Sequence, residues 1–437
     1  MRGKAAIVDP DPADYDRDGV SRAAAAAGAA MVFIVVPDGW GTASVPSVSA
    51  APFLPIPTVQ LDRDQGLALL ATMKWFPALL SLQGVPVSPY LYDVVQTERD
   101  RIPDKPVHRV TAANTAAVTT HYRQTGSGGE AKEQRFAWKP WQDFAVNEYQ
   151  RRVATPSTRE EYVSSGDTLW QHRVRHGLIW DEMSPLTGGM TTAPRTYANG
   201  EHVTEDWFAP VVRPAIPRGV PGLDSTREGD KLRIRIPEFA DSQAGHYGFN
   251  EGDDQAGPAV TSAKLFRDGQ LVSEQPYAFG TFPAGADPAT YRLDLSVRRD
   301  SPEWLFGTGT QTSWTFRSAR SAAPALLPLL QLDYAVEADA GNRLPAGRQA
   351  RIGLSARFQD GMATPDVRSM KAWASYDDGR TWRAVDVKRT GKSYEATIEH
   401  PALGATNSYV ALRVQATDTA GNAVDQTVLR AYGLSSK

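Results

Sequence analysis

Short runs of alternating apolar and polar residues dominate the chain from residue 88 to its end. Leu232, Ile234 and Ile236 alternate with two arginines, and a period of two places one face of a β-strand against a core. Glycine, proline, asparagine and aspartate separate such runs, and Asp268-Gly269 fits the turn of a two-residue hairpin. The pattern predicts a mainly β chain, and the regular strand spacing favours sandwiches over barrels.

The first 86 residues carry a different pattern, which predicts an α/β unit. Apolar runs rich in β-branched residues mark strands, and an alanine-rich segment marks a helix. The predicted elements are, in order, strand 4–8, a helix that Ser21 caps and that ends at Ala30, strand 32–36, strand 58–61 and helix 65–70. Only this part of the chain alternates strands with helices.

Two proline-rich stretches with weak patterning, 210–221 and 318–328, divide the β-rich part of the chain. They predict a β-rich middle domain followed by two β-sandwich domains of the immunoglobulin or fibronectin type III kind. The predicted domains are 1–86, 87–222, 223–320 and 325–437.

Charge and cysteine content exclude several classes of function. The 437 residues carry a formal net charge of -3 with acidic and basic residues interspersed, which argues against nucleic-acid binding. The chain has no cysteine, so disulfides, thiolate metal sites and a cysteine nucleophile are excluded. The apolar stretch 23–36 is too short to span a membrane as a helix, and its upstream flank is acidic where a signal peptide is basic. We therefore expect no membrane span and no signal peptide in this chain.

Motifs for hydrolysis are incomplete. A subtilisin-type triad needs an aspartate in a D-[ST]-G turn, a histidine before glycine and a nucleophile in G-T-S-x-A. The residues after His176-Gly177 do not continue such a motif, 307–310 lacks the serine, and Asp418 falls in a predicted hairpin. The G-x-S-x-G, H-E-x-x-H and phosphate-loop motifs are also absent. We predict no catalytic residue and no hydrolysis by this chain alone, with an unrecognised enzyme as the alternative.

Two groups of side chains are candidates for metal binding. His172 and His176 share a face if their segment is a strand, yet no third ligand stands at zinc spacing, so surface or core histidines are favoured. A loop with four acidic residues can hold calcium, although its spacing fits no known calcium loop and a solvated loop is favoured. These acidic residues are Asp241, Glu251, Asp253 and Asp254. We predict no metal and no cofactor, with calcium at this loop as the alternative.

Residues 375–382 fit the pattern S-x-D-x-G-x-T-W of the Asp-box hairpin, through Ser375, Asp377, Gly379, Thr381 and Trp382. The pattern predicts that Asp377 accepts hydrogen bonds from turn N–H groups, that Gly379 takes a positive φ and that Trp382 folds back on the hairpin. The motif resembles the Asp-box hairpin that recurs in sialidases, where it lies away from the active site. A single copy therefore predicts a structural role, with carbohydrate contact as the alternative.

Eleven tryptophans are spread along the chain. Exposed tryptophans can stack on sugar rings, whereas buried ones pack in cores and hairpins. Trp138 and Trp141 flank Lys139-Pro140, and Trp304 and Trp314 bracket a predicted hairpin. These two pairs are the candidate ligand surface, with core packing as the alternative interpretation.

Several segments resemble a family of known proteins. The first predicted strand, the helix running into the second strand, and the third strand with its helix resemble, in this order, a protease-associated (PA) domain. Further segments resemble the C-terminal, non-catalytic extension of large secreted subtilisin-like serine peptidases of Streptomyces and other actinobacteria. These segments are 87–93, 136–141, 239–242, 313–316, 375–382 and 418–432. In that family the peptidase domain lies upstream, so no triad residue is carried over to this chain.

The resemblance implies an extracellular protein with an accessory role. A PA unit would restrict substrate access, and the sandwiches would space or anchor a peptidase domain. The strands expected before residue 3 of a PA domain are missing, which predicts a truncated domain that results from a split gene, a misplaced start codon or a fragment. The implied partners are an upstream peptidase domain or its protein substrates. The alternative hypothesis is a stand-alone extracellular protein that binds cell-wall or other polysaccharide through exposed tryptophans.

Overall fold

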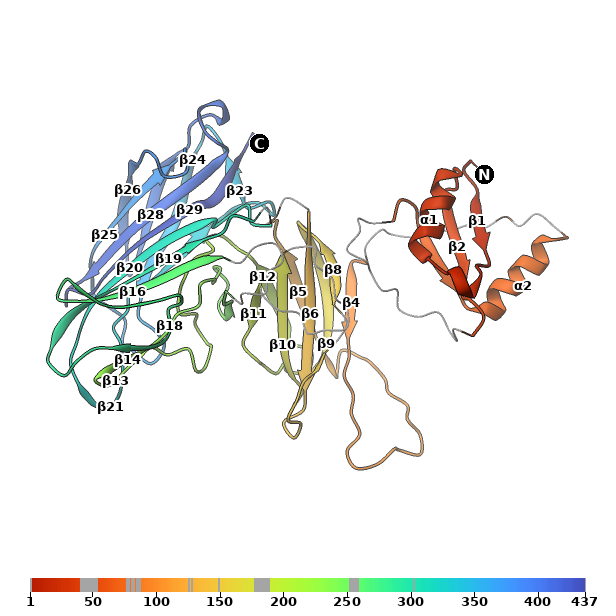
Figure 1. Cartoon of the computed structure of the whole chain (residues 1–437), viewed down its shortest axis with the longest axis horizontal. Helices are drawn as coiled ribbons and strands as arrows, with labels where there is room; N and C mark the ends of the chain where they lie inside the picture. Colours follow the sequence, from red (N-terminus) through yellow and green to blue (C-terminus); the bar gives the residue numbers. More distant parts are fainter. Residues whose placement is uncertain are drawn as a thin grey trace. The chain divides into compact units, whose positions relative to one another are not determined.

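The computed structural model divides the chain into two compact units, Met1–Val87 and Ser88–Lys437 (Figure 1). The described residues are 2–39, 54–75, 79, 83, 88–124, 126, 129–147, 150–176, 189–250, 259–301 and 303–436. Within these ranges the second unit consists of β-strands without an α-helix, so the prediction of a mainly β chain is confirmed. No helix among the described residues is long and apolar enough to cross a membrane.

The first unit is a parallel α/β unit. It contains β1 (Ala5–Val8), the short 3-10 helix η1 (Pro12–Asp14), α1 (Arg17–Ala26), β2 (Met31–Val35), β3 (Thr58–Leu61) and α2 (Arg63–Met73). The strands lie in the order β1-β2-β3 and pair in parallel, with Ala6 opposite Val32. Val32 and Ile34 are fully buried and belong to one core with Ala24 of α1.

Both helices begin earlier than predicted. The cap of α1 is Asp16, whose carboxylate accepts a hydrogen bond from the backbone N–H of Asp18 at 3.0 Å. The predicted cap, Ser21, lies inside the helix, where its hydroxyl is 2.7 Å from that of Thr58. The prediction was wrong because the aspartates and glycine before Ser21 are typical of a turn, whereas here they form the first helical turn. The α2 helix begins at Arg63, directly after an aspartate.

Two sheets form the first sandwich of the second unit, which we call the middle sandwich. One sheet contains, in order, β12 (His202–Trp207), β5 (Thr115–Tyr122), β9 (Ser157–Ser164) and β4 (Tyr90–Asp93). The other contains, in order, β15 (His246–Tyr247), β11 (Met190–Thr192), β10 (Leu169–His176), β6 (Glu130–Trp138) and β7 (Val146–Asn147), and β8 (Arg151–Ala154) pairs with β6. Side chains of β6 and β9 meet between the two sheets, as in the ion pair of Arg135 and Glu161.

A four-stranded sheet covers one side of the next core. It contains, in order, β18 (Phe279–Pro283), β14 (Lys231–Arg235), β13 (Thr226–Gly229) and β21 (Ser321–Leu326). Leu232 and Ile234 of β14 are fully buried, as their alternation predicted. Strand β21 lies in the stretch 318–328, where we expected a domain boundary. An exposed edge strand that tolerates Pro324 needs no apolar alternation, which explains why the pattern did not reveal it.

The remaining strands form one twelve-stranded sheet, which we call the long sheet. Its strands are, in order, β17 (Gln270–Gln275), β16 (Val260–Arg267), β19 (Ala289–Arg298), β20 (Gly309–Ser318), β29 (Ala423–Ser435), β28 (Tyr409–Asp418), β25 (Val367–Ser375), β26 (Arg383–Thr390), β27 (Ser393–Glu399), β24 (Gln349–Arg357) and β22 (Gln331–Val336), with β23 (Arg343–Pro345) paired to β29 and the 3-10 helix η2 (Leu403–Ala405) between β27 and β28. One half of β26 pairs with β25 and the other half with β27. Buried residues on both sides of this crossover, such as Ile352 and Val414, belong to one core.

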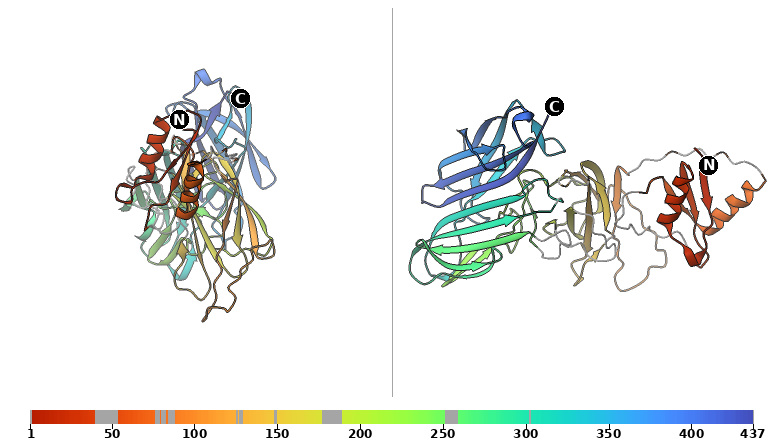
Figure 2. Two further views of the ribbon diagram at one scale, coloured as in Figure 1. Left: turned by 90° about the vertical axis from the view of Figure 1, so that its right-hand side faces the viewer. Right: turned by 45° about the horizontal axis from the view of Figure 1, so that its top comes forward.

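The two C-terminal sandwiches share the long sheet. Strand β20 pairs antiparallel with β29 over seven residue pairs, from Gly309 opposite Leu429 to Thr315 opposite Ala423. The strands β16, β19, β20, β29 and β28 therefore lie side by side across both sandwiches (Figure 1 and Figure 2). We expected two separate sandwiches at 223–320 and 325–437. Pairing between strands this far apart in the chain leaves no local signal, so the sequence did not reveal it.

The stretch 210–221, where we predicted a domain boundary, is not an exposed linker. Residues 207–217 are all buried. Within this segment Arg213 and Ala240 exchange two backbone hydrogen bonds, at 2.9 and 2.8 Å. One apolar core includes both Tyr122 of the middle sandwich and Leu434 of β29. The sandwiches of the second unit are therefore joined by a continuous core.

The turn predicted between β16 and β17 is confirmed. Asp268 and Gly269 have φ angles of 47° and 85°, the two positive values that a type I′ hairpin turn requires. The alternating apolar residues Val410, Leu412 and Val414 of β28 are all buried.

Candidate binding groove

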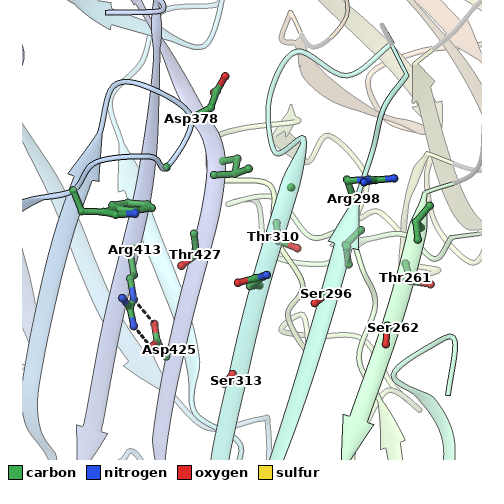
Figure 3. Close-up of a pocket in the computed structure, with 17 residues that line it drawn as sticks. Thr261, Ser262, Ser296, Arg298, Thr310, Ser313, Asp378, Arg413, Asp425 and Thr427 are labelled. Atoms are coloured by element: carbon green, nitrogen blue, oxygen red, sulfur yellow. Dashed lines mark hydrogen bonds and ion pairs between the residues drawn. The ribbon is translucent and has the colours of Figure 1, made fainter. Parts of the chain in front are cut away.

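A groove of about 710 Å³ crosses the long sheet at the joint between the last two sandwiches. Strands β16, β19, β20, β29 and β28 form its floor, and residues 378–382 between β25 and β26 form one wall (Figure 3). The polar lining residues labelled in Figure 3 are Thr261, Ser262, Ser296, Arg298, Thr310, Ser313, Asp378, Arg413, Asp425 and Thr427. Because β20 and β29 belong to different sandwiches, the groove exists only through their pairing.

Five lining side chains form a row across five strands, which we call the polar row. Ser262, Ser296, Gln311, Thr427 and Arg413 are direct cross-strand partners in that order. Neighbouring members lie one strand spacing apart, about 4.8 Å. Four of the five lie between two buried neighbours along their strand, and Ser262 lies beside the buried Ala263, so the row faces the groove side.

Arg413, at one end of the polar row, is held by Asp425 of β29. Its Nε donates to Asp425 Oδ1 at 3.0 Å and its Nη2 donates to Oδ2 at 2.6 Å (Figure 3). The guanidinium carbon lies 5.5 Å from the ring centroid of Trp373, its partner on β25. A paired and stacked guanidinium of this kind has a defined orientation.

The hydrogen bonds predicted for the Asp-box turn are confirmed. Asp377 Oδ1 accepts from the N–H of Thr381 at 2.9 Å, and Oδ2 accepts from the Thr381 hydroxyl at 2.6 Å. The Ser375 hydroxyl donates to Asp377 at 2.7 Å and accepts from the N–H of Gly379 at 2.9 Å. The bonds from the Thr381 hydroxyl and N–H, and then that from Ser375, lower the pKa of Asp377 to about 2. Gly379 has a φ of +84°, as predicted.

This turn forms the wall of the groove, a role not predicted from the sequence. Asp378, Gly379 and Trp382 all line the groove. Two hydrogen bonds of 3.1 Å from Arg430 hold the Asp378 carboxylate. The Trp382 ring packs against Gly379, where a Cβ would lie 3.4 Å from the Cζ2 atom of the indole. Trp382 is half-buried, so part of its ring stays accessible from the groove.

The charges that line the groove are compensated within the chain. Four charged side chains line it, and each has an oppositely charged partner within 4.0 Å. The ion pairs are Arg413–Asp425, Asp378–Arg430 and Arg298–Asp300. The groove therefore presents hydroxyl, amide and aromatic groups without an excess of charge.

The tryptophans selected from the sequence do not line this groove. Trp314 and Trp304 are 1% and 9% exposed, and Trp314 Nε1 donates to the carbonyl of Leu330 at 2.9 Å. The ligand-surface hypothesis was wrong for these two residues, because a pair of tryptophans around a hairpin is equally typical of core packing. Trp138 at the end of β6 is half-buried and Trp141 is exposed, so for this pair the hypothesis stays a prediction.

A second polar arrangement lies inside the middle sandwich. Ionisable side chains from both sheets form a buried layer, which we call the ionic layer. It contains Asp93, Glu133, Arg135, Arg151, Arg159, Glu161, His172 and Glu205. Arg135 is fully buried and forms ion pairs with Glu161 and, at 3.2 Å, with Asp93. The layer joins the two sheets of the sandwich across their interior.

Burial and neighbouring charges act in opposite directions on the ionic layer. Burial alone would raise the pKa of Glu133, but Arg159 and other cations hold it well below its usual range. Burial alone would lower the pKa of His172, but hydrogen bonds to Glu133 and Glu205 raise it overall. Burial raises the pKa of Asp93 to about 6, against the attraction of nearby arginines. Three guanidinium groups and a histidine with a raised pKa thus face four carboxyl groups.

His172 of the predicted histidine pair belongs to this ionic layer. Its Nδ1 lies 3.0 Å from a Glu205 oxygen, and its Nε2 lies 3.4 Å from a Glu133 oxygen. The side chain of His176 lies outside the described residues. The ring of His172 therefore contacts carboxylates from β12 and β6.

Asp241 of the predicted acidic loop is buried rather than solvated. It accepts a hydrogen bond from the N–H of Phe208 at 2.7 Å and lies 3.0 Å from His246 Nδ1. The rings of His246 and Trp207 stack with their centroids 3.9 Å apart. Across the described ranges, no hydroxyl is hydrogen-bonded to the imidazole ring of His172 or His246, the two histidines that pair with carboxylates. The other acidic residues of the loop, Glu251, Asp253 and Asp254, lie outside the described residues, so the choice between a solvated loop and its calcium-binding alternative is not tested for them.

Comparison with known proteins gives only distant similarity. No protein-family model matches the chain, and no curated protein matches it. Fibronectin(III)-like modules of Clostridium thermocellum CbhA are 14% identical, with 40% of this chain and 79% of that chain covered and a TM-score of 0.16. The FN1-FN3 domains of chicken CNTN1 are 11% identical, with 72% of this chain and 99% of that chain covered and a TM-score of 0.14. TM-scores this low do not support a functional assignment.

Proposed function

We propose that this chain is a non-catalytic binding region whose groove holds an extended polysaccharide. The observation that supports this proposal is the polar row across the joint of two sandwiches, with Trp382 on one wall. Serine, threonine and glutamine side chains exchange hydrogen bonds with hydroxyl groups. A partly accessible indole offers an apolar face on which a sugar ring can stack. A row of polar groups spaced at about 4.8 Å suits a polymer that carries hydroxyl groups on every repeat.

The charge balance of the groove supports a neutral polysaccharide. Each lining charge already has a partner within the chain, as in the pair of Arg413 and Asp425. A polyanion is held mainly by cations that replace its counterions, and the groove has no excess of cations among its described lining residues. A neutral chain needs only the hydroxyl, amide and aromatic groups that the groove presents.

Sedimentation with insoluble polysaccharides tests this proposal. The full chain is mixed with cellulose, chitin and purified bacterial cell wall, and the bound fraction is measured after centrifugation. We expect retention on at least one polymer, and we expect Trp382→Ala to lower the affinity by roughly tenfold through the loss of stacking. The matched control is Trp75→Ala, because Trp75 is 81% exposed and lies in the first unit, outside the groove. Retention on none of the polymers, or equal losses for both variants, would contradict the proposal.

We propose as a second candidate that the chain is the accessory region of a secreted subtilisin-like serine peptidase. The segments that resemble this family support it. The specific observation in its favour is that the three PA-like segments coincide with β1, with α1 and β2, and with β3 and α2. In this role the first unit would restrict substrate access, and the groove would anchor the enzyme to an extracellular polymer. Its partners would be an upstream peptidase domain or that domain's substrates.

A protease assay separates a binding role from catalysis. Casein or a peptide library is incubated with the full chain, with and without a serine-protease inhibitor. We expect no turnover, because no described hydroxyl is hydrogen-bonded to the imidazole ring of a histidine that pairs with a carboxylate. Turnover that the inhibitor abolishes would contradict both candidate functions.

A further inference from the structure

A second recess, of about 210 Å³, lies where the buried segment 207–217 approaches β22 and β24. Three arginines line it, together with Asp333 of β22. Arg213 lies in the buried segment, Arg218 follows it directly, and Arg357 is the last residue of β24. We call these four residues the basic recess. It shares no residue with the groove of the long sheet.

All three guanidinium groups converge on the single carboxylate of Asp333. Arg218 Nη2 lies 2.7 Å from Asp333 Oδ2, and Arg357 Nε lies 3.0 Å from the same oxygen. Arg213 Nη2 lies 3.3 Å from Asp333 Oδ1. One carboxylate neutralises only one of three guanidinium groups, so the cluster has an excess of positive charge.

The other acidic groups near the basic recess are already engaged. Asp241 lines the recess, but its carboxylate accepts backbone N–H bonds from Phe208 and Gln243 and bonds to His246. Asp360 accepts a backbone N–H at 2.7 Å. Even when Asp241 is included, three guanidinium groups face two carboxylates in the lining.

The two buried arginines are fixed, whereas the third has free donors. Arg213 donates to three backbone carbonyl oxygens, each at 2.9 Å. Arg357 Nη2 donates to the carbonyl of Ile216 at 2.7 Å. Arg218 is 52% exposed, and its bond to Asp333 is its one hydrogen bond among the described residues. Most of its N–H donors therefore remain available.

The pKa values of the cluster reflect this excess of positive charge. Burial lowers the pKa of Arg357, and the positive charges of Arg218 and Arg213 lower it further, which outweighs the attraction of Asp333. Burial alone would raise the pKa of Asp333, but the three arginines lower it overall. An additional anion would reduce the repulsion among the arginines.

We propose that the basic recess binds a small oxyanion, namely a carboxylate, sulfate or phosphate group. Guanidinium groups present paired N–H donors that match the oxygen atoms of such anions. Arg218 supplies free donors at the mouth, and Arg213 and Arg357 supply fixed positive charge behind it. This site is independent of the polysaccharide groove, so neither proposal depends on the other.

Titration of the full chain with inorganic phosphate, sulfate and acetate tests this inference. The ionic strength is kept constant with sodium chloride, and calorimetry gives the Kd while thermal unfolding gives the change in Tm. We expect at least one oxyanion to bind and to raise the Tm above that in chloride alone. Arg218→Ala should weaken this binding by about tenfold or more, because a charge-assisted hydrogen bond is lost.

The matched control is Arg351→Ala, because Arg351 lies on the same strand as Arg357 but is 70% exposed and outside the basic recess. This control should bind the anion as tightly as the wild type. Preference for acetate would identify a carboxylate as the ligand group, and preference for phosphate or sulfate a tetrahedral anion. The inference is overturned if all three anions act like chloride, or if Arg218→Ala binds them as tightly as the wild type.

Discussion

Replacing Arg135 by methionine removes the central cation of the ionic layer. The guanidinium is fully buried and lies within ion-pair distance of Glu161, of Asp93 at 3.2 Å and of Glu205 at 3.8 Å. After the replacement, the four carboxylates of the layer keep only two guanidinium groups and His172 as counter-charges. Four buried carboxylates then share three counter-charges, so one negative charge of the layer is left uncompensated.

The expected destabilisation is large. Leaving a buried charge without its partner costs about 3–5 kcal/mol of unfolding free energy. The pKa of Arg135 agrees with strong pairing, because burial lowers it but the carboxylates, Glu161 first, raise it well above its usual value. For a unit as long as Ser88–Lys437, each kcal/mol lowers the melting temperature by about 1–1.5 °C, so we expect a fall of roughly 3–8 °C.

Guanidinium chloride unfolding, followed by tryptophan fluorescence and circular dichroism, measures the loss. The double variant Arg135→Met with Glu161→Gln removes one orphaned carboxylate and should recover about 1–2 kcal/mol. The exposed Arg351→Met is the control and should stay within about 0.5 kcal/mol of the wild type. A loss below about 1 kcal/mol, typical of a surface pair, or a double variant no more stable than the single one, would refute the reasoning.

The pH dependence and the Asp-box turn give two more predictions. Burial alone would raise the pKa of Glu205, but the hydrogen bond from His172 and nearby cations lower it overall. Ionised Glu205 therefore contributes its full stabilisation of the fold above about pH 4.5, and this contribution is lost progressively as the pH falls below that value. Urea unfolding between pH 5 and pH 3 should show a shallower loss for Glu205→Gln than for the wild type, and equal slopes would contradict this. Ser375→Ala leaves the N–H of Gly379 without its acceptor and should cost about 1–2 kcal/mol in thermal unfolding. The same variant should also reduce retention on polysaccharide, because the turn that holds Trp382 is weakened; unchanged retention and Tm would argue against this role.

Features that depend on neighbouring residues could be predicted from the sequence. Leu232 and Ile234 revealed β14 through their alternation, and Asp268-Gly269 revealed the turn after β16. Each of these signals lies within one strand or one turn. The edge strand β21 has no comparable signal, because its exposed residues follow no alternation and Pro324 is tolerated at a sheet edge.

The ionic layer left a signal in the sequence that was not used. On β6, Glu133 and Arg135 occupy the same face as Ala131 and Ala137, and all four are buried. Charged residues in phase with apolar ones indicate a buried ion pair only if a facing strand supplies the partner. That partner, Glu161, comes from β9 in the opposite sheet, so the pairing depends on tertiary structure.

The groove could not be predicted from residue types. Its polar row consists mainly of serine, threonine and glutamine, which are common on any solvent-exposed strand face. These residues form a row only through the register of five strands, including the pairing of β20 with β29. Trp382 was recognised as part of a turn, but its place in a wall depends on that same register. Trp304 and Trp314 were wrongly selected because the sequence does not show whether an indole is exposed.

The pairing of β20 with β29 also has a mechanical consequence. Tandem domains usually articulate at a linker that few interactions cross. Here a change of angle between the last two sandwiches would break the backbone ladder of seven residue pairs. The two sandwiches are therefore expected to move as one rigid body. A pulling force on a ligand bound across them would be shared by the hydrogen bonds of this ladder. Such a rigid pair would keep the shape of the groove constant under mechanical load on the proposed polysaccharide.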